Sequence, residues 1–173
     1  MDRAFEISLS KLKDHENRFE FSVDEKFFER FEYSRISAAA VEFISFFEKA
    51  GSNIRVNTSW NGKVREVCDR CTENIFIPVS GENEVLIKFS DDEIESDDED
   101  IIFIPLHQTE FNMGQLLYDF LLTSIPMKVS CDIKGSEKNC NEETLKNLEK
   151  FNPETHHEDD DRWDALKGMI DEE

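Results

Sequence analysis

Four cysteines are the residues whose type and spacing first suggest chemistry. Cys68 and Cys71 stand three apart in the motif Cys68-Asp69-Arg70-Cys71, a spacing that lets two thiolates reach one zinc ion. Cys131 and Cys140 would have to supply the other two ligands. Eight residues lie between them, which is looser than the roughly two to four residues usual in zinc sites. Two interpretations stay open: a closed, structural zinc site of four cysteines, or separate reduced thiols without a metal.

A redox role for the Cys68–Cys71 pair is the third interpretation of this motif. Such a role needs the pair at the N-terminus of a helix in a βαβ unit. The sequence places it instead at the end of a predicted strand, which argues against redox chemistry. The chain opens without a secretory signal, and its longest apolar run, 113–125, is too short for a membrane span and carries Asp119. We therefore expect a cytoplasmic protein whose cysteines are reduced.

A basic and aromatic patch is the second candidate site. A predicted hairpin puts Trp60, Lys63 and Arg65 on one face, with Arg55 and Arg70 nearby. Such a patch could stack a base and meet phosphate, or contact a partner protein. The alternative is that the Lys and Arg stems cover an apolar strand face while their charged ends are solvated.

The element expected to position Cys68 is this hairpin. Ile54–Trp60 alternates, Asn61-Gly62 is a strong type I′ turn signal, and Lys63–Cys68 returns. A second hairpin is predicted from Asn74–Val79 through the turn 80–83 into Glu84–Phe89.

Further elements follow from apolar periodicity and capping residues. The segment Ala38–Phe47 fits a strand or a helix, and the turn signal at 49–52 favours the strand. The remaining expected elements are strands at Phe5–Leu9, Phe19–Val23 and Ile101–Ile104, a short helix capped by Asp24, a main helix over 112–125, and short helices after Asn141 and over 162–169. Together these predict an α+β fold with a mostly antiparallel, strongly curved β-sheet, one main packed helix and short C-terminal helices.

The charge of the chain is concentrated in its second half. Residues 1–71 hold 12 basic and 13 acidic side chains, whereas residues 72–173 hold 8 and 27. In the segment 91–100 eight of ten residues are acidic. We expect one domain over residues 1–151 with a mobile acidic loop at 90–100, followed by an acidic tail, 152–173, with a short terminal helix. Such a surface repels phosphate backbones and suits basic protein partners. The alternative is that the acidic side chains only keep the protein soluble.

No catalytic arrangement is recognisable in the sequence. It has no glycine-rich phosphate loop and no Ser/His/Asp ordering, and its carboxylates lie in runs rather than in apolar surroundings. We therefore expect a protein that is not an enzyme.

These pieces, in this order, resemble the YceD-like large ribosomal RNA subunit accumulation protein family. The resemblance covers roughly residues 40 to 170. It lies in the Cys68–Cys71 motif with its strand-rich flanks, the acidic loop, a Leu-rich helix with the stop Ile125-Pro126-Met127-Lys128, Cys131 and Cys140, and the closing motif Asp161–Lys167 with Arg162, Trp163 and Leu166.

The resemblance implies a bacterial, cytoplasmic, non-enzymatic factor in ribosome biogenesis that supports accumulation of large-subunit (23S) rRNA. The expected partner is a large-subunit ribosomal protein or a pre-ribosomal particle, and no membrane. Direct contact with rRNA stays open, but indirect contact is favoured. The alternative from a different class is a zinc-stabilised structural or adaptor module unrelated to ribosomes.

Overall fold

The computed structural model describes residues 3–91, 98 and 100–151. By internal contacts the chain divides into two units, Met1–Cys140 and Asn141–Glu173. The domain boundary expected at residue 151 remains a prediction. The predicted acidic tail and terminal helix, and most of the acidic loop, lie outside the described residues.

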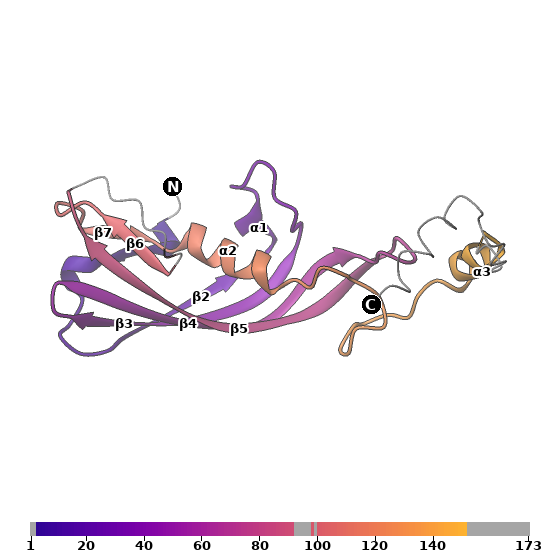
Figure 1. Ribbon diagram of the computed structural model, residues 1–173, viewed down its shortest axis with the longest axis horizontal. Coiled ribbons are helices and arrows are strands. Elements are labelled where there is room, and N and C mark those ends of the chain that lie inside the picture. Colours follow the sequence, from indigo (N-terminus) through magenta and orange to yellow (C-terminus); the bar gives the residue numbers. More distant parts are fainter. Residues whose placement is uncertain (1–2, 92–97, 99, 152–173) are drawn as a thin grey trace, which may run out of the picture. The chain divides into compact units, whose positions relative to one another are not determined.

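The first unit is an α+β fold built on a five-stranded sheet with the order β2-β3-β4-β5-β6 (Figure 1). All neighbours are antiparallel except β5 and β6, which are parallel. The strands are β2 (Asn17–Val23), β3 (Ala39–Ala50), β4 (Asn53–Val67), β5 (Asn74–Phe89) and β6 (Ile101–Ile104). The mostly antiparallel sheet is confirmed, but the strong curvature expected for it is not supported.

One face of the sheet carries the core. Side chains alternate along each strand, so Val41, Phe43 and Phe47 of β3 are buried on what we call the helix face. The open face carries the intervening residues, such as Glu42, which is exposed. The ambiguous segment 38–47 is therefore a strand, as favoured. Its hairpin turn is also confirmed, because Ala50 pairs with Asn53.

The two hairpins predicted within β4 and β5 are wrong. β4 runs without interruption through Asn61-Gly62, and Gly62 pairs with both Val41 and Val79. A Cβ on Gly62 would lie 2.2 Å from the carbonyl oxygen of Ala40. The glycine is needed for close approach of two strands rather than for a turn.

Gly81 has the same role in β5. It pairs with Trp60, and a Cβ there would lie 2.4 Å from Cζ2 of the indole. The Ser80–Asn83 segment, which has the composition of a turn, therefore continues the strand and makes room for the tryptophan. A local turn signal and a steric requirement call for the same residue type.

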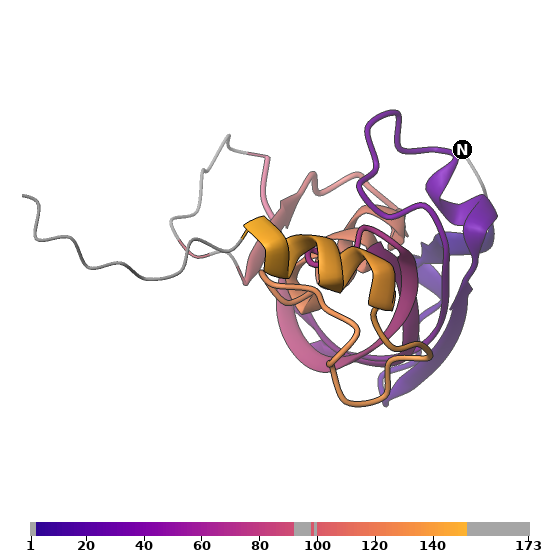
Figure 2. The ribbon, with the colours of Figure 1, turned by 90° about the vertical axis from the view of Figure 1, so that its right-hand side faces the viewer.

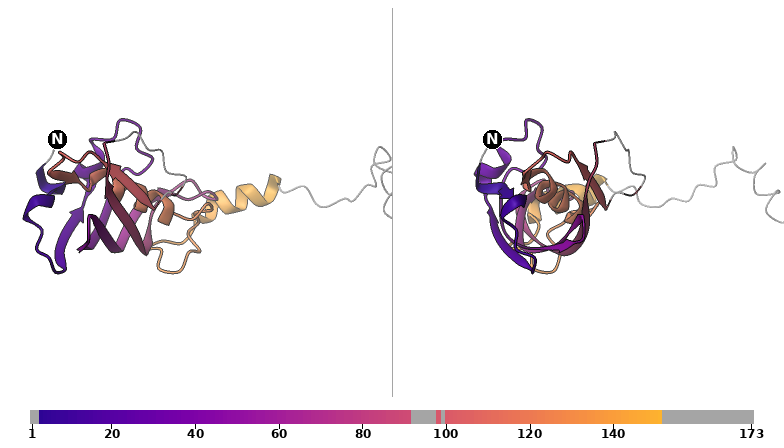
Figure 3. Two further views of the ribbon diagram at one scale, coloured as in Figure 1. Left: turned by 60° about the vertical axis from the view of Figure 1, so that its left-hand side comes forward. Right: turned by 90° about the vertical axis from the view of Figure 1, so that its left-hand side faces the viewer.

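The main helix, α2 (Gly114–Ser124), covers the helix face (Figure 2; Figure 3). The N-cap position is Met113, one residue after the cap predicted at Asn112, although the side-chain oxygen of Asn112 accepts a hydrogen bond from the N–H of Gly114 at 2.7 Å. Leu117 and Leu121 are fully buried, and Phe120 stacks on Trp60 at a centroid distance of 5.2 Å. The prediction of one main helix packed on the sheet is confirmed.

The N-terminal elements contribute buried side chains to the same core. β1 (Glu6–Ser8) pairs with β7 (Glu110–Asn112) in a separate two-stranded sheet. In the chain, β1 stands between the 3-10 turns η1 (Arg3–Phe5) and η2 (Leu9–Lys11). Helix α1 (Glu25–Phe28) is capped by the Asp24 carboxylate, as predicted, and buries two phenylalanines. In the second unit, the carboxamide of Asn141 caps α3 (Glu142–Phe151).

Candidate metal centre

The Cys68–Cys71 motif forms a tight turn at the end of β4. The N–H of Thr72 donates to the carbonyl of Cys68 at 2.9 Å, and the N–H of Cys68 donates to the carbonyl of Glu73 at 2.9 Å. Thr72 has a φ of 60°, a left-handed conformation that is unusual for a β-branched residue. The turn directs the chain into β5 and leaves both cysteines buried.

The two residues between the cysteines hold the segment that carries Cys131. The N–H of Asp69 donates to the carbonyl of Val129 at 2.8 Å, and the Asp69 carboxylate accepts from the N–H of Val129 at 2.7 Å. The guanidinium of Arg70 forms an ion pair with Asp132 at 2.7 Å. Asp69 and Arg70 thus bracket Cys131 and bring it to the turn.

All four cysteines meet in space. The sulfurs of Cys71 and Cys131 lie 3.6 Å apart, those of Cys68 and Cys140 lie 3.9 Å apart, and all four are within 4.8 Å of one another. Four thiolates about 2.3 Å from one tetrahedral ion are separated by about 3.8 Å. The donor set and its spacing therefore fit a zinc ion after a small contraction.

The thiols of the cluster titrate differently. Burial raises the pKa of Cys68, but N–H groups of Cys71, Arg70 and Cys131 donate to its sulfur and together lower that pKa to about 6. Burial raises the pKa of Cys131 and of Cys140. The surroundings of Cys68 therefore favour its thiolate without a metal, and a bound cation would favour the thiolate form at all four positions.

The basic and aromatic patch predicted on the hairpin does not form. Trp60 is 8% exposed on the helix face, whereas Lys63 and Arg65 lie on the open face. Each predicted contact cation already has a partner within the chain. The pairs are Arg55 with Glu48 and Glu84, Lys63 with Glu137, Arg65 with the Ser37 hydroxyl, and Arg70 with Asp132. Contact of these residues with RNA or a partner protein stays a prediction.

Sequence reasoning missed the positioning role of Asp69 and a buried carboxylate near the same turn. Glu66 is 7% exposed on the helix face of β4, and its Oε2 lies 3.7 Å from Nε of Arg35. Its Oε1 has no hydrogen-bond partner among the described residues. Burial raises the Glu66 pKa, with Arg35 opposing. The available signal was a charged residue at a position of β4 that faces the core. The incorrectly predicted hairpin turn at Asn61-Gly62 concealed that position.

The fold and this site define an α+β protein whose long sheet ends in a four-cysteine cluster. The sequence matches the family described as "Large ribosomal RNA subunit accumulation protein YceD" over residues 56–169, about two thirds of the chain. The chain belongs to this family. No curated protein and no solved structure matches it significantly.

The family match includes the closing motif with Arg162, Trp163 and Leu166, which lies outside the described residues. The cysteine cluster, β5 and α2 all fall within the matched range. None of the helices in the described part of the chain has the length and apolar character needed to span a bilayer.

Proposed function

We propose that this chain is a non-enzymatic, cytoplasmic factor in biogenesis of the large ribosomal subunit, supporting accumulation of 23S rRNA. The observation that carries the proposal is the family match over residues 56–169. The proposed action is binding of a basic large-subunit ribosomal protein or a pre-ribosomal particle. It is supported by the charge of residues 72–173, with 27 acidic against 8 basic side chains.

Within this function, zinc is the metal we propose for the four cysteines. Cys68 and Cys71 come from the turn between β4 and β5, while Cys131 and Cys140 come from the segment after α2. A closed site of this kind would fix that segment to the sheet and contribute to folding.

The proposed function is tested by deletion of the gene and complementation. Loss of the chain should lower the ratio of 23S to 16S rRNA, and the wild-type chain should restore it. Affinity purification at low salt should recover large-subunit precursors or a basic ribosomal protein. An unchanged rRNA ratio, together with no large-subunit component in the purified material, contradicts the proposal.

The cysteine geometry also supports a second candidate, a zinc-stabilised adaptor unrelated to ribosomes. Metal analysis separates it from the first only in combination with the rRNA measurement. One zinc per chain with a normal rRNA ratio after deletion favours the adaptor. One zinc per chain with a lowered ratio favours the ribosomal role.

A further inference from the structure

β5 is paired on both sides over only a small part of its length. On one side β4 pairs with it from Asn74 to Lys88, and on the other side β6 pairs with it only from Leu86 to Phe89 (Figure 1). Among the described residues, no strand pairs with the second side of Asn74–Val85. An unpaired strand edge of this kind is a template for an added strand.

The direction of the backbone groups along this edge follows from the hydrogen bonds at its end. Leu86 donates its N–H away from β4, to the carbonyl of Asp100 at 2.8 Å. In an antiparallel ladder the N–H and C=O groups of every second residue point to the same side. Ser80, Glu82 and Glu84 therefore point their backbone groups away from β4, toward the edge.

Two contacts limit the free part of the edge. A Cβ on Gly135 would lie 3.1 Å from Cγ of Pro78, so the segment after Cys131 passes β5 at that residue. At the other end, the edge is taken by Asp100 and β6 from Leu86 onward. Between them lies Val79–Val85, which we call the β5 window. In the described chain no backbone hydrogen bond reaches it except from β4.

The charged side chains of the window are both acidic. Glu82 and Glu84 are exposed on the open face, and Asp98 and Asp100, close to the Leu86 end, are exposed as well. Within the described part of the chain, Glu84 forms an ion pair with Arg55 at 3.3 Å, and no ion pair involves Glu82. The local charge is therefore negative on the same residues whose backbone groups face the edge.

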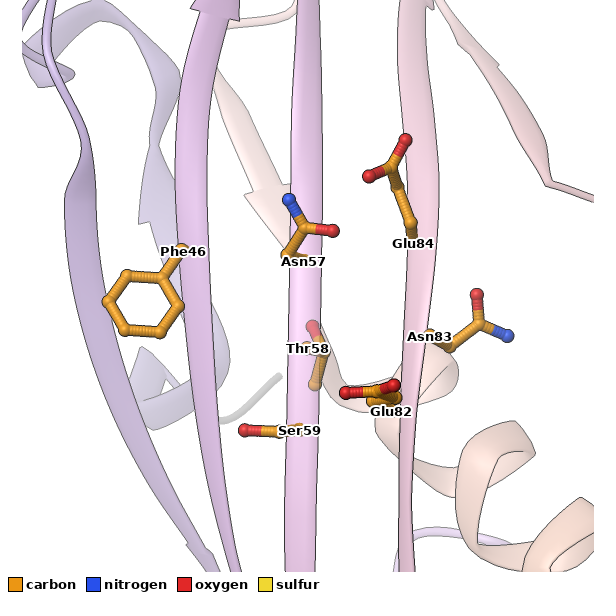
Figure 4. Close-up of a pocket in the computed structure, with 7 residues that line it drawn as sticks. All are labelled: Phe46, Asn57, Thr58, Ser59, Glu82, Asn83 and Glu84. Atoms are coloured by element: carbon orange, nitrogen blue, oxygen red, sulfur yellow. The ribbon is translucent and has the colours of Figure 1, made fainter.

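A hollow beside the window offers room for long side chains. It has a volume of about 490 Å³ and is lined by residues of three strands, Phe46, Asn57, Thr58, Ser59, Glu82, Asn83 and Glu84 (Figure 4). Figure 4 shows the carboxylates of Glu82 and Glu84 leaning toward β4, over this hollow. A strand added beside β5 at the usual spacing of about 4.8 Å would place those of its side chains that lie on the open face next to both glutamates.

We propose that the β5 window binds an extended, basic segment of a partner polypeptide as an added strand. Backbone groups of Ser80, Glu82 and Glu84 bond the segment, and its Lys or Arg side chains lie against the two glutamates. A second copy of this chain is a poorer occupant, because it would set the same acidic side chains against each other. The inference rests on the proposed function only in naming a basic ribosomal protein as the natural source of the segment.

The probe is a nine-residue peptide of alternating lysine and valine, added to the full-length chain in low salt. Fluorescence anisotropy of the labelled peptide measures affinity, and NMR measures amide exchange at Ser80, Glu82 and Glu84. We expect binding, and at saturation at least tenfold slower exchange of these three amides. Peptides with glutamate in place of lysine, or with every backbone nitrogen methylated, should bind at least tenfold more weakly.

Substitutions in the window separate the backbone from the charge contribution. Glu82→Pro removes an N–H group that points to the edge but no hydrogen bond to β4. Pro78, whose backbone points to the same side, already lacks this N–H. The substitution should weaken peptide binding at least tenfold. Glu82→Gln with Glu84→Gln should weaken it severalfold and flatten its salt dependence. The matched control, Glu29→Gln with Glu32→Gln, makes the same charge change outside the window and should leave affinity within twofold.

Three outcomes overturn the inference: no binding of the lysine peptide, equal binding of its methylated form, or unchanged exchange at the three amides. The first would mean that the glutamates and Pro78 serve only to keep the edge unpaired. Failure here does not affect the proposed function. Suppose that the Glu82→Pro chain restores 23S rRNA fully and that the wild-type chain binds no peptide. These results would exclude strand addition at the β5 window without contradicting the ribosomal role.

Discussion

Replacing Gly81 by alanine tests the register between β4 and β5. The added Cβ would lie 2.4 Å from Cζ2 of Trp60 and 2.9 Å from Cε2. An ordinary carbon–carbon contact is about 3.5–4.0 Å, so the closest distance is too short by more than about 1 Å. The indole has little freedom to retreat, because it stacks on Phe120 at 5.2 Å and on Phe43 at 5.9 Å. We expect this overpacking to lower the free energy of unfolding by about 2 kcal/mol.

A second substitution should relieve the first. Trp60→Leu alone should cost about 3 kcal/mol, because a buried ring is lost and a cavity remains. In that background the methyl group added at position 81 enters space that the indole has left, so Gly81→Ala should cost close to nothing. The resulting coupling energy between the two positions is about 2 kcal/mol.

Urea unfolding followed by far-UV circular dichroism measures the four free energies of the cycle. Fluorescence is unsuitable, since Trp60 is one of only two tryptophans in the chain. Gly51→Ala serves as the control: its φ is +67° and its added Cβ has no atom within 4 Å. It should cost about 1 kcal/mol through backbone conformation alone and add to Trp60→Leu within about 0.5 kcal/mol.

Additive effects of Gly81→Ala and Trp60→Leu would refute the reasoning. They would mean that residue 81 does not face the indole, so β5 is not paired with β4 in this register. The interpretation of Ser80–Asn83 as a turn would then return, and the β5 window would lose its basis.

Three further predictions concern the cysteine cluster and its surroundings. Purified protein should contain about one zinc per chain by mass spectrometry, Cys71→Ser should contain less, and chelation should lower the melting temperature. Asp69→Ala should lower the free energy of unfolding, measured with urea, by about 2 kcal/mol, because the N–H of Val129 loses its carboxylate acceptor. Asp69→Asn should lower it less. Equal effects of the two substitutions would contradict the role of the carboxylate. Burial raises the pKa of Glu66 above its unfolded value, so the folded protein keeps a proton at a pH where the unfolded chain has lost it. The free energy of unfolding relative to Glu66→Gln should therefore fall as pH rises above the ordinary glutamate pKa of about 4.5. A difference that does not change with pH would exclude this.

Local signals in the sequence were sufficient for several elements. Asp24, Asn112 and Asn141 each accept a hydrogen bond at the start of the predicted helix, because capping depends on residues only two or three positions apart. The strand at 38–47 was favoured correctly because a turn followed it directly. The position of Cys68 at the end of a strand was also predicted correctly, since the alternation that reveals a strand is a short-range feature.

Glycine was the residue type that local reasoning misread. Asn61-Gly62 and Ser80-Gly81 carry the composition of hairpin turns, yet both pairs lie inside long strands. Whether a glycine bends the chain or admits a neighbour depends on what lies across the sheet. For Gly62 that neighbour is the backbone of β3, and for Gly81 it is the indole of Trp60, neither of which a local pattern reveals.

The sequence by itself determined the four cysteines as a candidate donor set, the capped helices, the acidic second half and the family of the chain. Tertiary structure decided whether those donors meet. Cys68 and Cys140 are 72 positions apart, yet their sulfurs lie 3.9 Å from each other. Asp69, Arg70 and Lys63 hold the segment after α2 through Val129, Asp132 and Glu137. Tertiary structure also decided which edge of the sheet stays unpaired, because that depends on the order of strands in space, and short-range spacing contains no information about that order.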